Sequence, residues 1–316
     1  MKQNKNDINK INATVCGVAL LLGWCIVSAI ARIFTANTVQ LYSPTLVCFY
    51  TFLITSVFYF LLCLLQSRQL FLAIRNNFFN VFMLNMSSFG GWFFLVYPLK
   101  VIQPSVVSTI TLGLGPFSSI LLGKIILKSW TANQSEKIIS AIITVIILFL
   151  CGVCFFQKAG IVSLQRTDAQ ILLALGACLI CGISTSINNL YAKKLAAKKV
   201  APTQILALRF WLIAILSLIF EMTFSNHSTP FSLPLFLVMA KLAFLLVIIP
   251  LYLAQHGIKY LSPASVALIA PLMPILLALF EWHEKIILPV SLWVSMFAII
   301  TCVFIFGIIQ IFWRKR

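Results

Sequence analysis

The sequence predicts an all-α integral membrane protein with ten transmembrane helices, arranged as two inverted repeats of five. Three observations support this fold class: the composition, ten apolar stretches, and residues that recur at half the chain length. Of the 316 residues, 61% are apolar and 9% are charged, and the mean hydropathy is +1.06. Soluble domains carry about 45–50% apolar and about 25% charged residues. The composition therefore excludes a soluble enzyme, a disordered protein and a secreted disulfide scaffold.

The ten apolar stretches are each close to the roughly 20 residues that a helix needs to cross a bilayer. Short connections separate them, and none is long enough for a soluble domain. Prolines lie near the start of several stretches, which suits the first turn of a helix. Ser43 and Ser262 precede two of these prolines as candidate N-caps. The predicted spans are 13–33, 44–65, 78–97, 104–127, 138–156, 170–191, 202–224, 234–254, 263–282 and 288–312.

The charge distribution predicts the orientation. Lys and Arg number 23 and Asp and Glu number 6, a formal charge of +17. With the N-terminus inside, 16 basic residues fall in inner segments and five in outer segments. This ratio places both termini in the cytoplasm. The outer five are Arg32, Lys100, Lys158, Arg166 and Lys285.

The expected partners are the lipid bilayer and a small-molecule solute. Nucleic acid is not expected, because no basic surface interleaved with aromatic residues is long enough to follow phosphates. No cofactor and no metal are expected. The CxxC pairs at 151–154 and 178–181 lie in apolar spans without the loops that fold around zinc. The sequence carries no signal for or against a homo-oligomer.

An internal repeat divides the chain at its midpoint. Short matches recur in order at an offset of 158 or 159 residues. They pair S-P-T at 43–45 with A-P-T at 201–203, Phe52 with Phe210, and K-V-I-Q-P at 100–104 with K-Y-L-S-P at 259–263. Residues 1–157 and 158–316 are therefore predicted to be two five-helix repeats. Because five is odd, the second repeat enters the membrane from the opposite side, as in many transporters.

Charged residues inside spans are the first functional candidates. Arg209 lies roughly 10 Å into its span, where a charge needs a partner, a cavity or a route to the interface. Either it binds a carboxylate or phosphate of a substrate, or it extends to the cytoplasmic headgroups. Lys241 lies equally deep from the other face, and Glu221 ends the preceding span. A structural ion pair between Glu221 and Lys241 is predicted, with a substrate role for Lys241 as the alternative.

Polar residues inside other spans are the further substrate-binding candidates. Asn85 and Trp92 lie in the third span, and Ser184 and Asn188 in the sixth. Amides and hydroxyls in an apolar helix face a cavity or a neighbouring helix. His256 is the remaining titratable candidate, with an interfacial histidine as the alternative. No carboxylate lies near the membrane centre, so direct proton coupling is not supported.

Four residues are candidates for helix kinks or gating. Gly115 and Pro116 lie together in the fourth span, and Pro271 and Pro274 lie in the ninth. Proline inside a helix removes a backbone hydrogen bond and bends the helix. Broken helices often line transport sites.

Two parts of the second half resemble the EamA-type branch of the drug/metabolite transporter superfamily. They are the run from Pro202 to Phe210, and the run from Lys259 to Ala264 followed by Pro271, Pro274 and Glu284. The resemblance implies a ten-helix carrier that usually exports small metabolites, with a cavity built from spans 1, 3, 4, 6, 8 and 9. The first half departs from the pattern. Ser129 occupies the position equivalent to Glu284, and Thr51 occupies the position equivalent to Arg209. Neither the glutamate nor the arginine role is therefore carried over to the first half.

The leading hypothesis is a secondary transporter of small organic metabolites. We expect an exporter of an amino-acid-like, anionic or zwitterionic solute, in a bacterial inner membrane. The alternative is a non-transporting membrane scaffold or partner protein. An enzyme is not expected and no catalytic residue is predicted, because the cluster Glu281-Trp282-His283-Glu284 lies where a membrane interface favours such residues. No GxxxxGK[ST] loop occurs, so ATP is not expected to drive transport.

Overall fold

The computed structural model describes residues 2–66, 70–127, 134–163, 165–224, 232–260, 269–270, 272–284 and 288–313. Within these ranges the regular structure is helical, and one isolated β-bridge joins Ile102 to Ile161. The all-α prediction is confirmed. The elements are α1 (Lys2–Leu41), α2 (Pro44–Leu65), α3 (Leu70–Val96), η1 (Pro98–Lys100), α4 (Pro104–Leu127), α5 (Gln134–Phe156), α6 (Asp168–Ala197), α7 (Pro202–Leu208), α8 (Trp211–Phe224), α9 (Leu233–Leu242), η2 (Ala243–Ile248), α10 (Ile249–Tyr260), α12 (Leu272–His283) and α13 (Val290–Trp313).

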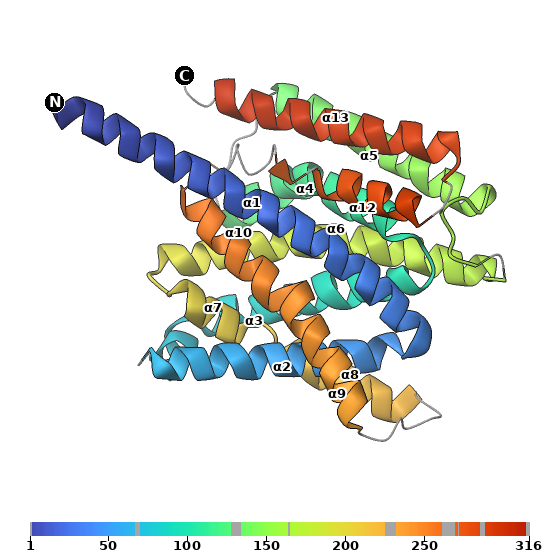
Figure 1. The fold of residues 1–316 in the computed structure, drawn as a ribbon, viewed down its shortest axis with the longest axis horizontal. Helices are drawn as coiled ribbons and strands as arrows, with labels where there is room; N and C mark the ends of the chain where they lie inside the picture. The colour runs from blue at the N-terminus through green and yellow to red at the C-terminus, as the bar shows by residue number, and fades with distance from the viewer. Residues whose placement is uncertain are drawn as a thin grey trace.

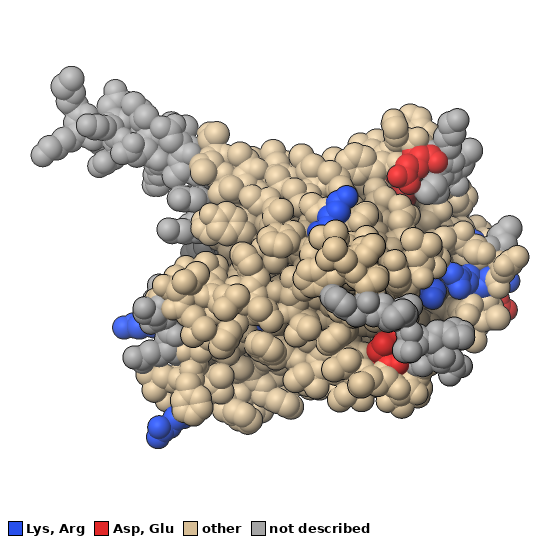
Figure 2. Space-filling model, turned by 60° about the horizontal axis from the view of Figure 1, so that its bottom comes forward, with Lys and Arg blue, Asp and Glu red and all other residues tan. Residues whose placement is uncertain are grey.

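Eight helical segments of the described chain are long and apolar enough to cross a membrane. In three of them consecutive elements join, at Leu70–Lys100, at Pro202–Phe224 and at Leu233–Gly257. Two further apolar segments, Leu272–His283 and Val290–Phe306, are shorter. A multi-pass membrane protein is therefore confirmed, while the count of ten spans remains a prediction. Figure 2 shows one face that is almost free of charged side chains, with Lys and Arg mainly toward its two ends.

Several helices begin where the sequence places a cap or a proline. Ser43 accepts a hydrogen bond from the backbone N–H of Leu46 at 3.2 Å, directly before the proline that opens α2. Thr167 and Gln170 form a reciprocal capping box at the start of α6. These caps satisfy backbone N–H groups that have no partner inside the helix. The second predicted cap, Ser262, lies outside the described residues.

Three interruptions divide otherwise continuous spans. Asn77 in α3 has non-helical dihedral angles, φ −138° and ψ 28°. The seventh span breaks at Arg209 and Phe210, between α7 and α8. The eighth passes through the π-helical segment η2 between α9 and α10. Breaks and π-bulges inside membrane helices often mark functional positions.

The helices pack mainly in the pairs α3 with α6, α4 with α6, α1 with α10, α2 with α8, and α5 with α13. Figure 1 shows α1 beginning and α13 ending at the same end of the bundle. Phe52 of α2 and Phe210 meet inside it, each 0% exposed, with ring centroids 5.3 Å apart. The two phenylalanines matched across the predicted repeats are therefore in contact.

Candidate functional site

A cavity of about 340 Å³ lies between α1, α3, α4, α6, α10 and α12. These helices are the six spans that the resemblance implies. Trp24, Trp92 and several leucines supply its apolar wall. Its polar lining residues are Ser28, Arg32, Ser87, Ser88, Thr111, Thr185, Asn188, Asn189, Arg209 and Gln255. The volume and the mixed lining suit a small organic molecule with polar groups.

Arg209 lines this cavity from the break between α7 and α8, and its side chain is 7% exposed. Its Nη2 donates a hydrogen bond to Oδ1 of Asn188, and its guanidinium lies 4.9 Å from the Phe210 ring centroid. Its Nε has no hydrogen-bond partner among the described residues. A guanidinium buried in this way does not reach the headgroups. The geometry thus favours the substrate-facing interpretation.

Asn188 holds the guanidinium in place. Its Nδ2 donates to the Leu84 carbonyl oxygen at 3.1 Å and to the hydroxyls of Ser87 at 3.2 Å and Ser88 at 2.7 Å. Because the Leu84 carbonyl can only accept, the amide is oriented with Oδ1 toward Arg209. Asn188 was a predicted substrate-binding residue, and its side chain is 3% exposed at the cavity wall.

Arg32 is a second cavity guanidinium, and the sequence interpretation missed it. The prediction ended the first span at residue 33 and counted Arg32 as an outer loop charge, which is wrong. α1 continues to Leu41, which places Arg32 about 13 Å from the helix end. Its Nη1 donates to the Ser108 hydroxyl of α4. The signal was available, since no proline or glycine interrupts residues 24–43.

The cavity wall carries positive charge without a matching negative charge. None of the described residues that line it has a carboxylate side chain. Two guanidiniums at membrane depth are costly unless something compensates them. The site is therefore suited chemically to an anionic group of a ligand.

Three of the predicted substrate-binding residues are absent from the described lining of the cavity. Asn85 instead stabilises the helix break, because its Nδ2 donates to the Leu208 carbonyl at 2.6 Å and its Oδ1 accepts from the Leu212 N–H at 3.3 Å. Ser184 packs directly against Gly90 of α3. His256 is exposed and its Nδ1 is 2.9 Å from the Tyr252 carbonyl oxygen, in line with the interfacial alternative.

The predicted kink residues have different surroundings. Pro116 lies inside α4 as predicted, and a Cβ on neighbouring Gly115 would meet no atom within 4 Å. Pro274 does not kink a continuous helix. It lies in the first turn of α12, just after a turn at Ala270, where proline is tolerated. Pro271 lies outside the described residues.

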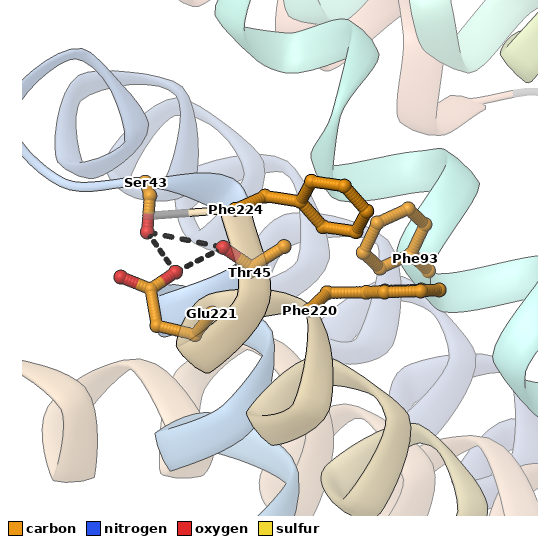
Figure 3. Close-up of a pocket in the computed structure, with 6 residues that line it drawn as sticks. All are labelled: Ser43, Thr45, Phe93, Phe220, Glu221 and Phe224. Carbon is orange, nitrogen blue, oxygen red and sulfur yellow. Dashed lines mark hydrogen bonds between the residues drawn. The ribbon is translucent and has the colours of Figure 1, made fainter. Parts of the chain in front are cut away.

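The predicted ion pair between Glu221 and Lys241 does not form. The Glu221 carboxylate accepts hydrogen bonds from the hydroxyls of Ser43, at 2.6 Å, and Thr45. Figure 3 shows the carboxylate facing these hydroxyls beside a cluster of phenylalanines. The Lys241 ammonium instead lies 4.8 Å from the Phe34 ring centroid. The ion pair was predicted because Glu221 and Lys241 lie in consecutive spans. The hydroxyl donors at the start of α2 are far from Glu221 in the sequence, so the sequence did not reveal them.

We expect Glu221→Gln to destabilise the protein modestly, by about 1 kcal/mol, because hydrogen bonds to a charged acceptor are stronger than those to an amide. The thermal midpoint of detergent-solubilised protein measures this effect. Glu284→Gln is the matched control, since Glu284 is exposed. Equal midpoints for the two variants would contradict the assigned role of Glu221.

Glu281 makes a similar contact at the start of α4. Its carboxylate accepts from the backbone N–H of Ser105 at 2.9 Å and from the Ser105 hydroxyl, and it is 1% exposed. An acceptor at a helix N-terminus satisfies unpaired N–H groups and complements the helix dipole. Glu281 thus joins α12 to α4, a role that its position beside Trp282 did not suggest.

A comparison with known protein families matches the second half of the sequence. Residues 168–308 match the EamA-like transporter family. The resemblance seen in the sequence is thereby confirmed. The match implies a membrane transporter of the drug/metabolite transporter superfamily, and this EamA-like region contributes Asn188 and Arg209 to the cavity.

Solved structures extend the likeness in fold. A crystal structure of another protein aligns with 94% of this chain and 95% of its own length, with a TM-score of 0.62 and 18% sequence identity. At that identity the likeness concerns the fold alone, and it covers both halves of the chain. A search of curated proteins gives no sequence match.

Proposed function

We propose that this protein is a secondary carrier that moves a small anionic or zwitterionic organic metabolite across a bacterial inner membrane by alternating access. The observation that carries the proposal is the central cavity with Arg32 and Arg209 in its wall. Asn188 anchors Arg209 through Nη2 alone, and Arg209 lines the cavity, so its guanidinium can still donate to a ligand. A guanidinium is well suited to bind carboxylate or phosphate groups.

The helix packing supports two inverted repeats, with ten spans in all. In two such repeats span 3 is equivalent to span 8, and span 6 is equivalent to span 1. The packing of α3 against α6 should therefore recur as packing of α10 against α1, and both pairs do pack. Likewise α4 is equivalent to α12, and α6 to α1. The pair α4 and α6 packs, and so does the equivalent pair α12 and α1. Equivalent residues that touch must lie near the two-fold axis, which suits the contact of Phe52 with Phe210. Repeats related in this way can rock around a central site.

We further propose that the cavity opens toward the cytoplasm in this conformation. α1 begins and α13 ends at one end of the bundle, which the basic residues assign to the cytoplasm (Figure 1). Thr185 and Asn189, in the half of α6 nearer that end, line the cavity and are exposed. At the other end Glu281 joins α12 to α4, and Arg166 donates to the Lys100 carbonyl at 3.1 Å. An export cycle would open these outer contacts.

Loss of Arg209 tests the proposal. We expect Arg209→Ala to reduce flux of the transported solute at least tenfold. The anionic group of the solute would lose a charge-assisted contact with the guanidinium in a water-poor site. Untargeted mass spectrometry would compare solutes inside and outside cells, or vesicles, that contain native protein, the variant or no carrier. Protein abundance in the membrane is matched first.

Arg75→Ala is the matched control, since Arg75 is exposed on α3 and lies outside the cavity. Normal flux with Arg209→Ala would remove the proposed role of the cavity arginine. The absence of any protein-dependent flux would favour the alternative, a non-transporting membrane scaffold or partner.

A further inference from the structure

The two cavity arginines are held by different helices. Arg32 of α1 donates to Ser108 of α4, and Arg209 donates to Asn188 of α6. Each anchor uses a single guanidinium nitrogen, and both guanidiniums line the same cavity. Arg32 and Arg209 are therefore two separately anchored positive charges in one cavity.

The anchors also lie at different depths in the membrane. α4 and α6 cross closely at Thr111 and Gly182, because a Cβ on Gly182 would lie 2.8 Å from the Thr111 carbonyl oxygen. α4 and α6 begin at the same end of the bundle (Figure 1). Ser108 comes about one turn before the crossing on α4, and Asn188 comes six residues, or about 9 Å, after it on α6, so the anchors lie on opposite sides of the crossing. The two anchors therefore hold the two guanidiniums at different levels of the cavity.

The protein supplies no described counter-charge at this site. Five of its six acidic residues lie in regions whose side chains are described, and none of the five lines the cavity. Asp168 pairs with Lys158, while Glu221 and Glu281 accept from hydroxyls at helix starts. A zwitterion adds no net negative charge and leaves a net charge of two on the site, and a monoanion leaves a net charge of one.

Building on the proposed carrier function, we propose that the solute is a dianion with two separate acidic groups, bound between Arg32 and Arg209. One carboxylate or phosphate lies at each guanidinium, and the intervening carbon skeleton lies against the apolar wall that includes Trp24 and Trp92. This class differs from the amino-acid-like solute expected from the sequence, because that expectation rested on Arg209 alone.

The test measures binding by titration calorimetry with the full-length protein in lipid nanodiscs. The probes are succinate, glutarate, adipate and pimelate, each paired with its monoamide. The monoamide has the same length and shape and lacks one negative charge. We expect the preferred dicarboxylate to bind at least tenfold more tightly than its monoamide, which corresponds to one lost charged contact.

Two variants test the two-point geometry. Arg32→Gln and Arg209→Gln are each expected to lower dicarboxylate affinity to the level of the monoamide. The monoamide affinity should change less than threefold in at least one of them, because a monoanion needs only one guanidinium. A variant that merely misfolds would weaken both probes together. Arg75→Gln is the charge-matched control and should bind all probes as the native protein does.

Equal binding of dicarboxylate and monoamide by the native protein would overturn the dianion proposal, as would tighter binding of zwitterionic glutamine. Absence of binding by every probe would overturn it too. These outcomes are separable from failure of the carrier function. If flux measurements detect a transported solute with no charge or one negative charge, the carrier stands and the dianion proposal falls. If no solute moves, the carrier itself falls.

Discussion

Asn188→Leu is expected to abolish solute flux and to lower the free energy of unfolding by about 3 kcal/mol. The substitution removes the acceptor of the Arg209 guanidinium and leaves that charge buried without its partner. It also removes the donor to the Leu84 carbonyl and to the hydroxyls of Ser87 and Ser88. Buried polar groups that lose a partner carry the full cost of their desolvation.

Two further variants separate stability from binding. Asn188→Asp keeps an acceptor for Arg209, so it should be more stable than Asn188→Leu in thermal unfolding. It should still fail to transport, because the new carboxylate neutralises the guanidinium that the solute requires. Asn189→Leu is the stability control, since Asn189 makes no hydrogen bond to another described residue. Native stability and flux for Asn188→Leu would show that Asn188 does not position Arg209.

Gly182→Ala is the second substitution with a large expected effect, a loss of about 2–3 kcal/mol in unfolding free energy. The added Cβ would lie 2.8 Å from the Thr111 carbonyl oxygen and 2.9 Å from the Leu114 Cβ. Neither atom is the far end of a flexible side chain, so α4 and α6 must separate. Overpacking of this kind costs about 1–3 kcal/mol, and membrane helices rely on small residues for close contact.

Gly176→Ala on the same helix is the matched control. A Cβ at Gly176 would meet no atom within 4 Å, so the change should leave stability unchanged or raise it by up to about 1 kcal/mol through helix propensity. Thermal midpoints of the two variants in one detergent give the comparison. Equal midpoints would contradict the close crossing of α4 and α6.

Several features of the fold followed from the amino acids alone. The apolar stretches gave the membrane class, since backbone groups in a bilayer must be satisfied within a helix. Ser43 and Pro44 marked the start of α2, because caps and first-turn prolines act within a few residues. The sequence matched Phe52 with Phe210 at an offset of 158 residues, and their contact, which the sequence did not predict, comes from the structure.

The positions of individual polar side chains were harder to predict. Arg32 was assigned to a loop because the predicted first span ended at residue 33. The helix α1 continues beyond that point, through Thr35 and Thr38. Both threonines donate to backbone carbonyls four residues earlier, which satisfies their hydroxyls inside the helix. Asn85 and Asn188 have the same side chain, yet one stabilises a helix break and the other anchors Arg209.

Local sequence was therefore sufficient for the membrane class, for several helix starts, and for the choice of Arg209 and Asn188 as candidates. These properties depend on hydropathy and on hydrogen bonds that span only a few residues. The convergence of Arg32 with Arg209 on one cavity, and the pairing of Glu221 with Ser43 rather than Lys241, were decided by tertiary packing. These pairs are 177 and 178 positions apart in the sequence, and only the way the helices cross places Arg32 and Arg209 on one cavity and Ser43 beside Glu221.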